Sequence, residues 1–194
     1  MGWSNVKGLA IHHSASANHV KVDHEDCKTV WAGIKKYHLS KGYRDIAYNY
    51  GVCAHGRVLT GRTWADNSGA NGDTTVNAQY GAICVLGLSP KATEVVSNGI
   101  KRLRGTWLER FPTARLVVPH SALNQTACPG DPLRAYIKNK KYEEEDLPQF
   151  TEAQAQWLKD FVKSQKEVGA KPTSLARVVQ WYRYCKAWWV KPTG

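Results

Sequence analysis

Apolar and polar positions along the chain change between strand-like and helix-like patterns. Residues 6–13 form an apolar run that predicts a strand. Residues 23–38 carry apolar side chains at three-to-four spacing, which predicts an amphipathic helix. The same reasoning predicts further strands at 46–53, 58–60, 80–88 and 115–118, and a second helix from 89 to about 111. Because strands and helices are intermixed, we expect an α/β domain with a central mixed β-sheet flanked by helices.

Side-chain alternation in these strands makes two further predictions. His12 and His13 should face opposite sides of the sheet, so at most one of them can face a given site. Tyr48 and Tyr50, two positions apart, should share one face. Residues 66–77 are rich in Asn, Gly, Asp, Ser and Thr, and we expect them to form a surface loop of the kind that borders a binding groove.

The pattern changes after residue 138. Residues 139–147 are a charge run without apolar periodicity, which indicates a linker between a domain over 1–138 and a C-terminal region. Residues 148–194 show two helical apolar stripes separated by a Gly–Pro break, which predicts a helical hairpin. Its aromatic side chains, interleaved with Arg and Lys, exceed what one packed face requires. The hairpin is therefore a candidate anchor for a cell wall or membrane, and packing on the main domain or a second copy is the equal alternative.

The composition suits a folded protein with an anionic partner. The chain has 194 residues, of which 42% are hydrophobic, and its net charge is +11. Nucleic acid, an anionic membrane and an anionic cell-wall polymer all fit this charge, although no module for specific nucleic-acid recognition is evident. The N-terminus has no signal-peptide pattern, and no apolar run is long enough to span a bilayer. We therefore expect the protein to be made and kept in the cytoplasm unless another factor releases it.

The loop over 119–132, PHSALNQTACPGDP, carries the first sign of chemistry. It holds His120 and Cys128, and the flanking Pro119 and Pro129 argue against one continuous helix. A loop that folds back can bring an imidazole and a thiolate onto one ion, and this ligand pair suits zinc. The chain has five widely spaced cysteines and no CxxC pair, so we expect most of them to be reduced core residues.

Five segments in order resemble the zinc N-acetylmuramoyl-L-alanine amidases, a family that includes phage endolysins and peptidoglycan recognition proteins. The resemblance covers residues 6 to 138 and is carried by IHHSA (11–15), YRDIAYNYGV (43–52), LTGRTW (59–64), YGAIC (80–84) and His120 with CPGD (128–131). It implies that zinc is held by His12, His120 and Cys128. The choice of His12 over His13 rests on the resemblance, because alternation says only that the two face apart.

The resemblance also implies which residues act around the metal. The family's active-site tyrosine corresponds to Tyr48, and a position that is lysine or threonine in the family corresponds to Thr126. Thr63 and Trp64 stand where recognition proteins contact the third residue of the stem peptide. The chain departs from the family pattern at 79–80, where Gln and Tyr replace the usual serine and isoleucine, which leaves the shape of the groove wall open.

The implied activity is hydrolysis of the amide between N-acetylmuramic acid and L-alanine by a zinc-activated water. Three protein ligands leave a fourth position for that water, as in catalytic zinc sites. A phage-type endolysin that waits in the cytoplasm for holin-made holes and then degrades peptidoglycan fits these features best. The alternatives are a cytoplasmic amidase of peptidoglycan recycling and a recognition protein that binds without cutting. Cys128 weighs against the latter, because binding-only family members tend to lack the cysteine ligand.

Overall fold

A five-stranded mixed β-sheet lies at the centre of the computed structural model, which describes residues 2–15, 24–88 and 90–143. The strand order is β3-β2-β4-β1-β5, with β3 antiparallel to β2 and the other neighbours parallel. The strands are β1 (Gly8–His13), β2 (Tyr50–Val52), β3 (Val58–Thr60), β4 (Tyr80–Val85) and β5 (Leu116–Pro119). The predicted α/β fold with a central mixed sheet is confirmed.

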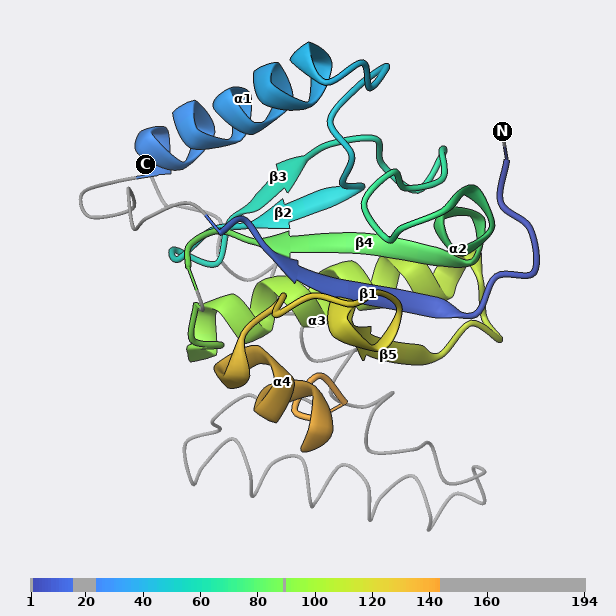
Figure 1. Cartoon of the computed structure of the whole chain (residues 1–194). Helices are drawn as coiled ribbons and strands as arrows, with labels where there is room; N and C mark the ends of the chain where they lie inside the picture. Colours follow the sequence, from blue (N-terminus) through green and yellow to red (C-terminus); the bar gives the residue numbers. More distant parts are fainter. Residues whose placement is uncertain (1, 16–23, 89, 144–194) are drawn as a thin grey trace, which may run out of the picture. The chain divides into compact units, whose positions relative to one another are not determined.

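Helices cover both faces of this sheet (Figure 1). Helix α1 (His24–Ser40) lies over one face, and α3 (Glu94–Arg110) and α4 (Asp131–Lys138) lie over the other. The short helix α2 (Thr74–Gln79) leads directly into β4, and a 3₁₀ turn, η1 (His120–Ala122), follows β5. None of the helices in the described part of the chain is long and apolar enough to cross a bilayer.

Each face of the sheet has its own apolar core. The core toward α3 and α4 is the larger and includes Leu9, Ile11, Val52, Ile83, Val85, Ile100, Trp107 and Leu133. The core toward α1 includes Cys27, Trp31, Ile46, Cys53, Leu59, Cys84 and Leu86. On this second face the Trp31 ring lies flat against β2, where a Cβ on Gly51 would approach it to 2.8 Å. A glycine is therefore required at position 51 for α1 to lie this close to the sheet.

The segment expected to form a strand over 46–53 is a strand only at its end. The Asn49 side chain makes one of the two hydrogen bonds to β4 there: its Oδ1 accepts from the Ala82 N–H at 2.8 Å, while the Asn49 N–H donates to the Ala82 carbonyl at 3.0 Å. Without regular alternation, Tyr48 packs on the α1 face near Trp31, whereas Tyr50 packs against Trp64 in the opposite core. The prediction that the two tyrosines share a face is wrong, because the backbone before Tyr50 is not a strand.

Residues 66–77 are not simply a surface loop. Four of their polar side chains are buried, and α2 begins inside the segment with Asp73 as its N-cap. The buried residues are Asn67, Ser68, Asn71 and Asn77. Helix α4 was not predicted at all, although Leu133, Tyr136 and Ile137 form its short buried stripe. The sequence pattern did not predict α2 because its segment is polar, and it did not predict α4 because that helix is short.

The boundary between the two predicted regions lies near the end of the described residues. The first compact unit of the chain extends from Met1 to Glu144. Tyr142, inside the segment expected to be a linker, is buried in the larger core and lies 6.4 Å from Tyr136 between ring centroids. The rest of that linker and the predicted C-terminal hairpin lie outside the described residues.

Candidate metal centre

The sheet register brings the two predicted histidine ligands together. Strands β1 and β5 are parallel neighbours in which Ile11 pairs with Pro119, so the next residues, His12 and His120, lie side by side. Their ring centroids are 4.2 Å apart. Both histidines stand at the carboxyl end of their strands, the edge where α/β sheets bind ligands. His12 is 1% exposed, so its ring lies inside the protein rather than on its rim.

The loop after β5 folds back and places the cysteine beside them. The Ser121 N–H donates to the Cys128 carbonyl at 3.0 Å, which closes the loop between the histidine and the cysteine. The Cys128 Sγ then lies 3.9 Å from the His12 Nδ1, and one ligand atom from each of His12, His120 and Cys128 lies within 4.8 Å of the others. In a tetrahedral zinc site, sulfur and nitrogen ligands are about 3.6 Å apart. The three side chains are thus placed to converge on one ion.

Two hydrogen-bonding features fit a metal at this point. His120 Nε2 is buried and has no hydrogen-bond partner among the described residues, an arrangement that a metal ion would relieve. His12 Nε2 lies 2.8 Å from Asn71 Oδ1, so the ring donates its N–H there and leaves the Nδ1 lone pair facing Cys128. Metal-binding histidines commonly donate their second nitrogen to an oxygen in this way.

The Asn71 side chain can present only its oxygen to His12. Its Nδ2 donates to Ser68 Oγ at 2.7 Å and to the Tyr80 carbonyl at 2.6 Å, which fixes the orientation of the amide. The Asn71 backbone N–H is held in turn by Asn77 Oδ1 at 2.8 Å. Sequence patterns did not single out Asn71, because an asparagine in a run of polar residues resembles a turn. Its burial is the signal that identifies it.

Burial also sets the protonation states of the cluster. Desolvation, and then the neighbouring charge of His120, lower the pKa of His12 to about 3, so its imidazole is neutral at physiological pH. Burial likewise lowers the pKa of His120. Desolvation raises the pKa of Cys128, even though the His13 N–H donates to its Sγ at 3.3 Å. Two neutral imidazoles and a thiol that needs a cation to ionise are a suitable donor set for zinc.

Tyr48 lies against the cluster on the α1 side. Its ring centroid is 5.3 Å from that of His12 and 6.0 Å from that of Trp31, on which it stacks. Burial and the adjacent Cys84 and Cys128 sulfurs raise the pKa of Tyr48 well above its usual value. The phenol therefore keeps its proton and acts as a hydrogen-bond donor beside the three ligands.

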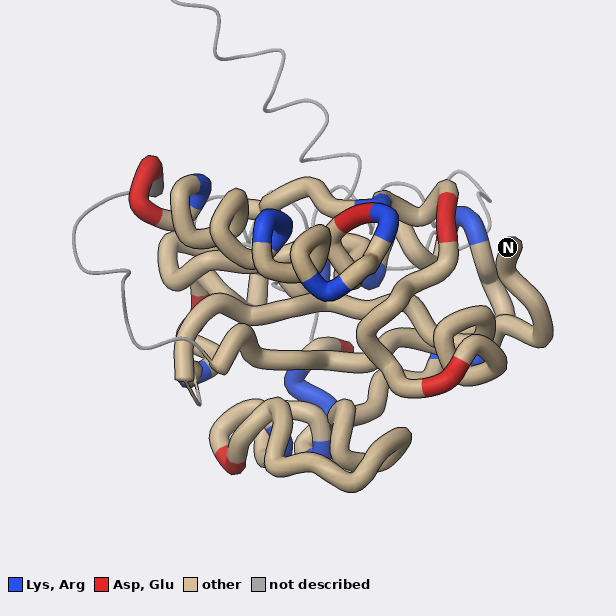
Figure 2. Tube along the Cα trace, turned by 45° about the horizontal axis from the view of Figure 1, so that its top comes forward, with Lys and Arg blue, Asp and Glu red and all other residues tan. Residues whose placement is uncertain are grey.

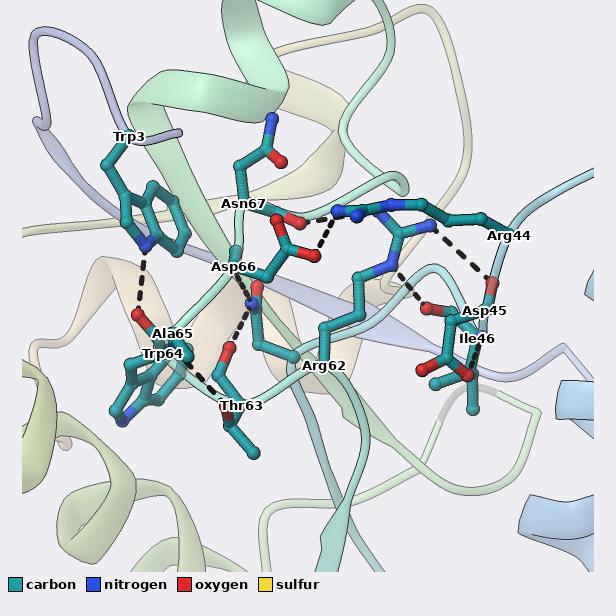
Figure 3. A network of polar contacts seen from close by, with 11 residues as sticks. Trp3, Arg44, Asp45, Ile46, Arg62, Thr63, Trp64, Ala65, Asp66 and Asn67 are labelled. Carbon is teal, nitrogen blue, oxygen red and sulfur yellow. Dashed lines mark hydrogen bonds and ion pairs between the residues drawn. The ribbon is translucent and has the colours of Figure 1, made fainter. Parts of the chain in front are cut away.

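A polar network holds the segment that carries Tyr48 (Figure 3). Arg62 donates through Nε to the Ile46 carbonyl at 2.7 Å and through its terminal nitrogens to the carbonyls of Asn67 and Asp45. Arg44 pairs with Asp66 across the same two segments. These contacts fasten residues 44–47 to residues 62–67, so the network supports the position of Tyr48 without touching the metal ligands.

The other predicted site residues lie in different surroundings. Thr126 Oγ1 accepts from the Cys128 N–H at 3.2 Å, so Thr126 helps to hold the cysteine. Trp64 is 6% exposed, and its indole donates to Thr106 Oγ1 in the core on the α3 side. Thr63 has a φ of 58° and accepts from the Ala65 N–H. Their contact with a stem peptide stays a prediction, and the burial of Trp64 gives it no support.

His13 is not part of the three-residue cluster. Desolvation, and then the charge of Arg134, lower its pKa. Of the two adjacent histidines, only His12 belongs to the cluster. The family resemblance selected the same histidine, and its role as a metal ligand stays a prediction.

Neither the pocket among the described residues nor their surface charge points to this centre. A pocket of about 380 Å³ lies between α1 and β3, and its lining includes none of the three candidate ligands. Lys and Arg residues are spread over several elements rather than gathered on one of them (Figure 2). The positive charge of the described residues thus does not single out one face for an anionic partner.

Several solved structures resemble this fold. Peptidoglycan recognition protein LE in complex with tracheal cytotoxin, a monomeric diaminopimelic acid-type peptidoglycan, has a TM-score of 0.64 at 23% identity, covering 72% of this chain and 83% of its own. Drosophila PGRP-LB has a TM-score of 0.61 at 23% identity, covering 78% of this chain and 85% of its own. The endolysin amidase LysCS of Clostridium intestinale URNW has a TM-score of 0.54 at 21% identity, covering 70% of this chain and 83% of its own.

These three likenesses concern the fold, and no curated protein matches the chain at a significant level. The sequence model of the N-acetylmuramoyl-L-alanine amidases matches residues 2–131, the stretch that contains every member of the metal cluster. That match covers well over half of the 194 residues. The chain belongs to the N-acetylmuramoyl-L-alanine amidase family.

Proposed function

We propose that the protein is a zinc-dependent peptidoglycan hydrolase of the endolysin type, which cleaves the amide between N-acetylmuramic acid and the L-alanine of the stem peptide. The observation that carries the proposal is the convergence of His12, His120 and Cys128 at the carboxyl edge of the sheet. These three residues would hold the ion. When bound, zinc supplies a Lewis acid that generates a nucleophile from water at neutral pH and polarises the scissile carbonyl.

The ligand set controls the charge of the centre. His12 enters as a neutral imidazole, because burial keeps its pKa near 3, and its N–H stays on the nitrogen that faces Asn71. Cys128, as a thiolate, would contribute the only negative charge among the three ligands. A bound divalent ion would therefore keep a net positive charge, which would favour negative charge that develops on the substrate.

Tyr48 is the residue of this chain that we assign to the developing charge. Its phenol stays protonated and lies beside His12, so it can donate a hydrogen bond to the oxyanion of the tetrahedral intermediate. A single such donor contributes about 10²–10³ in rate. Thr126 acts mainly through Cys128, because its Oγ1 accepts a hydrogen bond from the Cys128 backbone N–H. Its own hydroxyl proton can serve as a second, weaker hydrogen-bond donor to the oxyanion.

The deciding experiment measures which bond is broken. Purified peptidoglycan is incubated with the full chain, and new amino-terminal alanine and new reducing sugar ends are quantified with chelator and with zinc restored. We expect alanine that disappears with chelator and returns with zinc. Cys128→Ser should abolish alanine release, whereas His13→Gln, which replaces a neighbouring histidine outside the three-residue cluster, should retain it. Reducing ends in place of alanine would identify a different bond.

A recognition protein that binds without cutting is the second candidate, because two of the structural neighbours are peptidoglycan recognition proteins. Zinc-loaded protein that sediments with the wall and releases no alanine would favour it. The presence of Cys128 in contact distance of His12 supports the hydrolase instead. Release of alanine only from soluble muropeptides, and none from intact walls, would favour a recycling amidase over an endolysin.

A further inference from the structure

A second group of metal-binding side chains lies on the α1 face, outside the amidase centre. It consists of Cys27 on α1, Cys53 immediately after β2, and His55 in the turn that leads to β3. One ligand atom from each lies within 4.8 Å of the other two. The two cysteines are buried and carry thiols rather than a disulfide, while the histidine is exposed.

The distances between these atoms are those of a tetrahedral metal site. His55 Nδ1 lies 3.3 Å from Cys27 Sγ and 3.7 Å from Cys53 Sγ. With metal–sulfur bonds of about 2.3 Å and metal–nitrogen bonds of about 2.1 Å, a tetrahedral ion separates sulfur from nitrogen by about 3.6 Å. An ion would therefore require only small movements of the three side chains.

The chemistry of the three groups suits a soft metal ion. Both thiol sulfurs lie near the same nitrogen, His55 Nδ1. Two thiolates and an imidazole form a soft donor set, which selects zinc over hard cations.

The turn that carries His55 is held in place before any ion binds. The Cys53 N–H donates to the Arg57 carbonyl at 3.1 Å, and the Gly56 N–H donates to the Cys53 carbonyl at 2.8 Å. Gly56 has a φ of 71° and lies so close to α3 that a Cβ would come within 2.3 Å of the Val95 carbonyl oxygen. The turn therefore has little freedom, and His55 is kept beside Cys53.

We propose that Cys27, Cys53 and His55 form a second zinc site, which clips α1 to the end of β2. Three protein ligands leave the fourth position to water on the exposed side of His55. The role assigned to this site is to join a helix to the sheet across the smaller core, and its three protein ligands differ from the set of four that structural zinc sites usually have. The assignment does not depend on the amidase activity proposed above.

Metal counting on the full chain tests the proposal. Reduced protein is loaded with zinc, passed over a desalting column and analysed for zinc per chain, and the same series is repeated with cobalt to record thiolate-to-metal charge transfer. We expect two ions per chain in the unaltered protein and one in His55→Gln, which alters an exposed side chain and leaves the core unchanged. His120→Ala should also bind one ion, with the stronger charge-transfer band of a two-thiolate site.

The matched control is Cys84→Ser, which removes a buried thiol of the same apolar cluster without removing a ligand of either site. It should still bind two ions. One ion per chain in the unaltered protein, or unchanged zinc content in both His55→Gln and Cys27→Ser, would overturn the proposal. A Cys27–Cys53 disulfide that forms in preference to metal binding, detected as the loss of two titratable thiols, would overturn it as well.

Discussion

Asn71 offers the sharpest test of how the amidase centre is built. It is fully buried, and its Oδ1 accepts from His12 while its Nδ2 donates to Ser68 Oγ and the Tyr80 carbonyl. Asn71→Ala leaves the His12 N–H and the Tyr80 carbonyl without partners. Each buried unsatisfied group costs about 1–3 kcal/mol, so unfolding free energy should fall by about 2–6 kcal/mol. Removing such an oxygen also weakens metal binding by about 10- to 100-fold.

The two effects are separated by a matched variant. Asn49 is equally buried and makes three hydrogen bonds to backbone groups: its side chain donates to the carbonyls of Thr63 and Asp66 and accepts from the Ala82 N–H. Asn49→Ala should cost similar stability yet leave zinc affinity unchanged, since it touches no ligand. Asn71→Asp keeps the acceptor toward His12 and should recover most of the affinity that Asn71→Ala loses.

Two measurements decide the matter. Zinc affinity is measured by competition with a chromophoric chelator under conditions where urea titration shows each variant fully folded. Nitrogen-15 NMR of the imidazole then reports whether His12 still carries its proton on Nε2, a readout independent of turnover. If Asn71→Ala binds zinc as tightly as Asn49→Ala and keeps the same tautomer, Asn71 does not orient His12.

Four further outcomes follow from the site. Cys128→Ser should lose zinc and activity together, as seen by metal analysis and alanine release. Tyr48→Phe should keep zinc but lose about 10²–10³ in kcat, and full turnover would remove the phenol from the mechanism. Arg62→Met should lower unfolding free energy by about 2–4 kcal/mol in urea and leave zinc affinity unchanged, because its charged hydrogen bonds reach only the carbonyls around Ile46. In metal-free protein, His12 has a pKa of about 6.5 in the unfolded chain and about 3 in the folded chain. Protonation of His12 therefore favours the unfolded chain below pH 6.5, and the free energy of unfolding should decrease by about 2 kcal/mol between pH 6.5 and pH 5. His12→Gln should make this decrease smaller.

The parts of the fold with long periodic patterns were predictable from sequence. Apolar runs located all five strands within a few residues, and three-to-four spacing located α1 and α3. The ordering of the strands was not accessible, because pairing between β1 and β5 joins segments about a hundred residues apart. That pairing is what places His120 next to His12.

Two of the predictions that went wrong, the strand over 46–53 and the surface loop over 66–77, have one physical cause in common. Asparagine side chains take over hydrogen bonds that regular backbone would otherwise make, and single-sequence patterns treat such residues as loop formers. The expected strand over 46–53 begins only after Asn49, and Tyr48, just before it, lies next to His12. Asn71 and Asn77 turned an expected surface loop into a buried support for the metal centre. In both cases a residue that the sequence placed elsewhere, Tyr48 or Asn71, lies beside His12.

The two candidate metal-binding clusters are connected through the face of the sheet that α1 covers. His12 and Gly51 both pair with Cys84 of β4, and the neighbouring Cys84 sulfur helps to raise the pKa of the Tyr48 phenol. Trp31 of α1 lies on Gly51 and stacks on Tyr48, so the position of α1 helps to set the position of the phenol. A clip at Cys27, one turn before Trp31, would therefore hold α1 where Tyr48 needs it. If so, His55→Gln should speed hydrogen exchange in α1 and lower kcat without changing zinc affinity at the amidase centre.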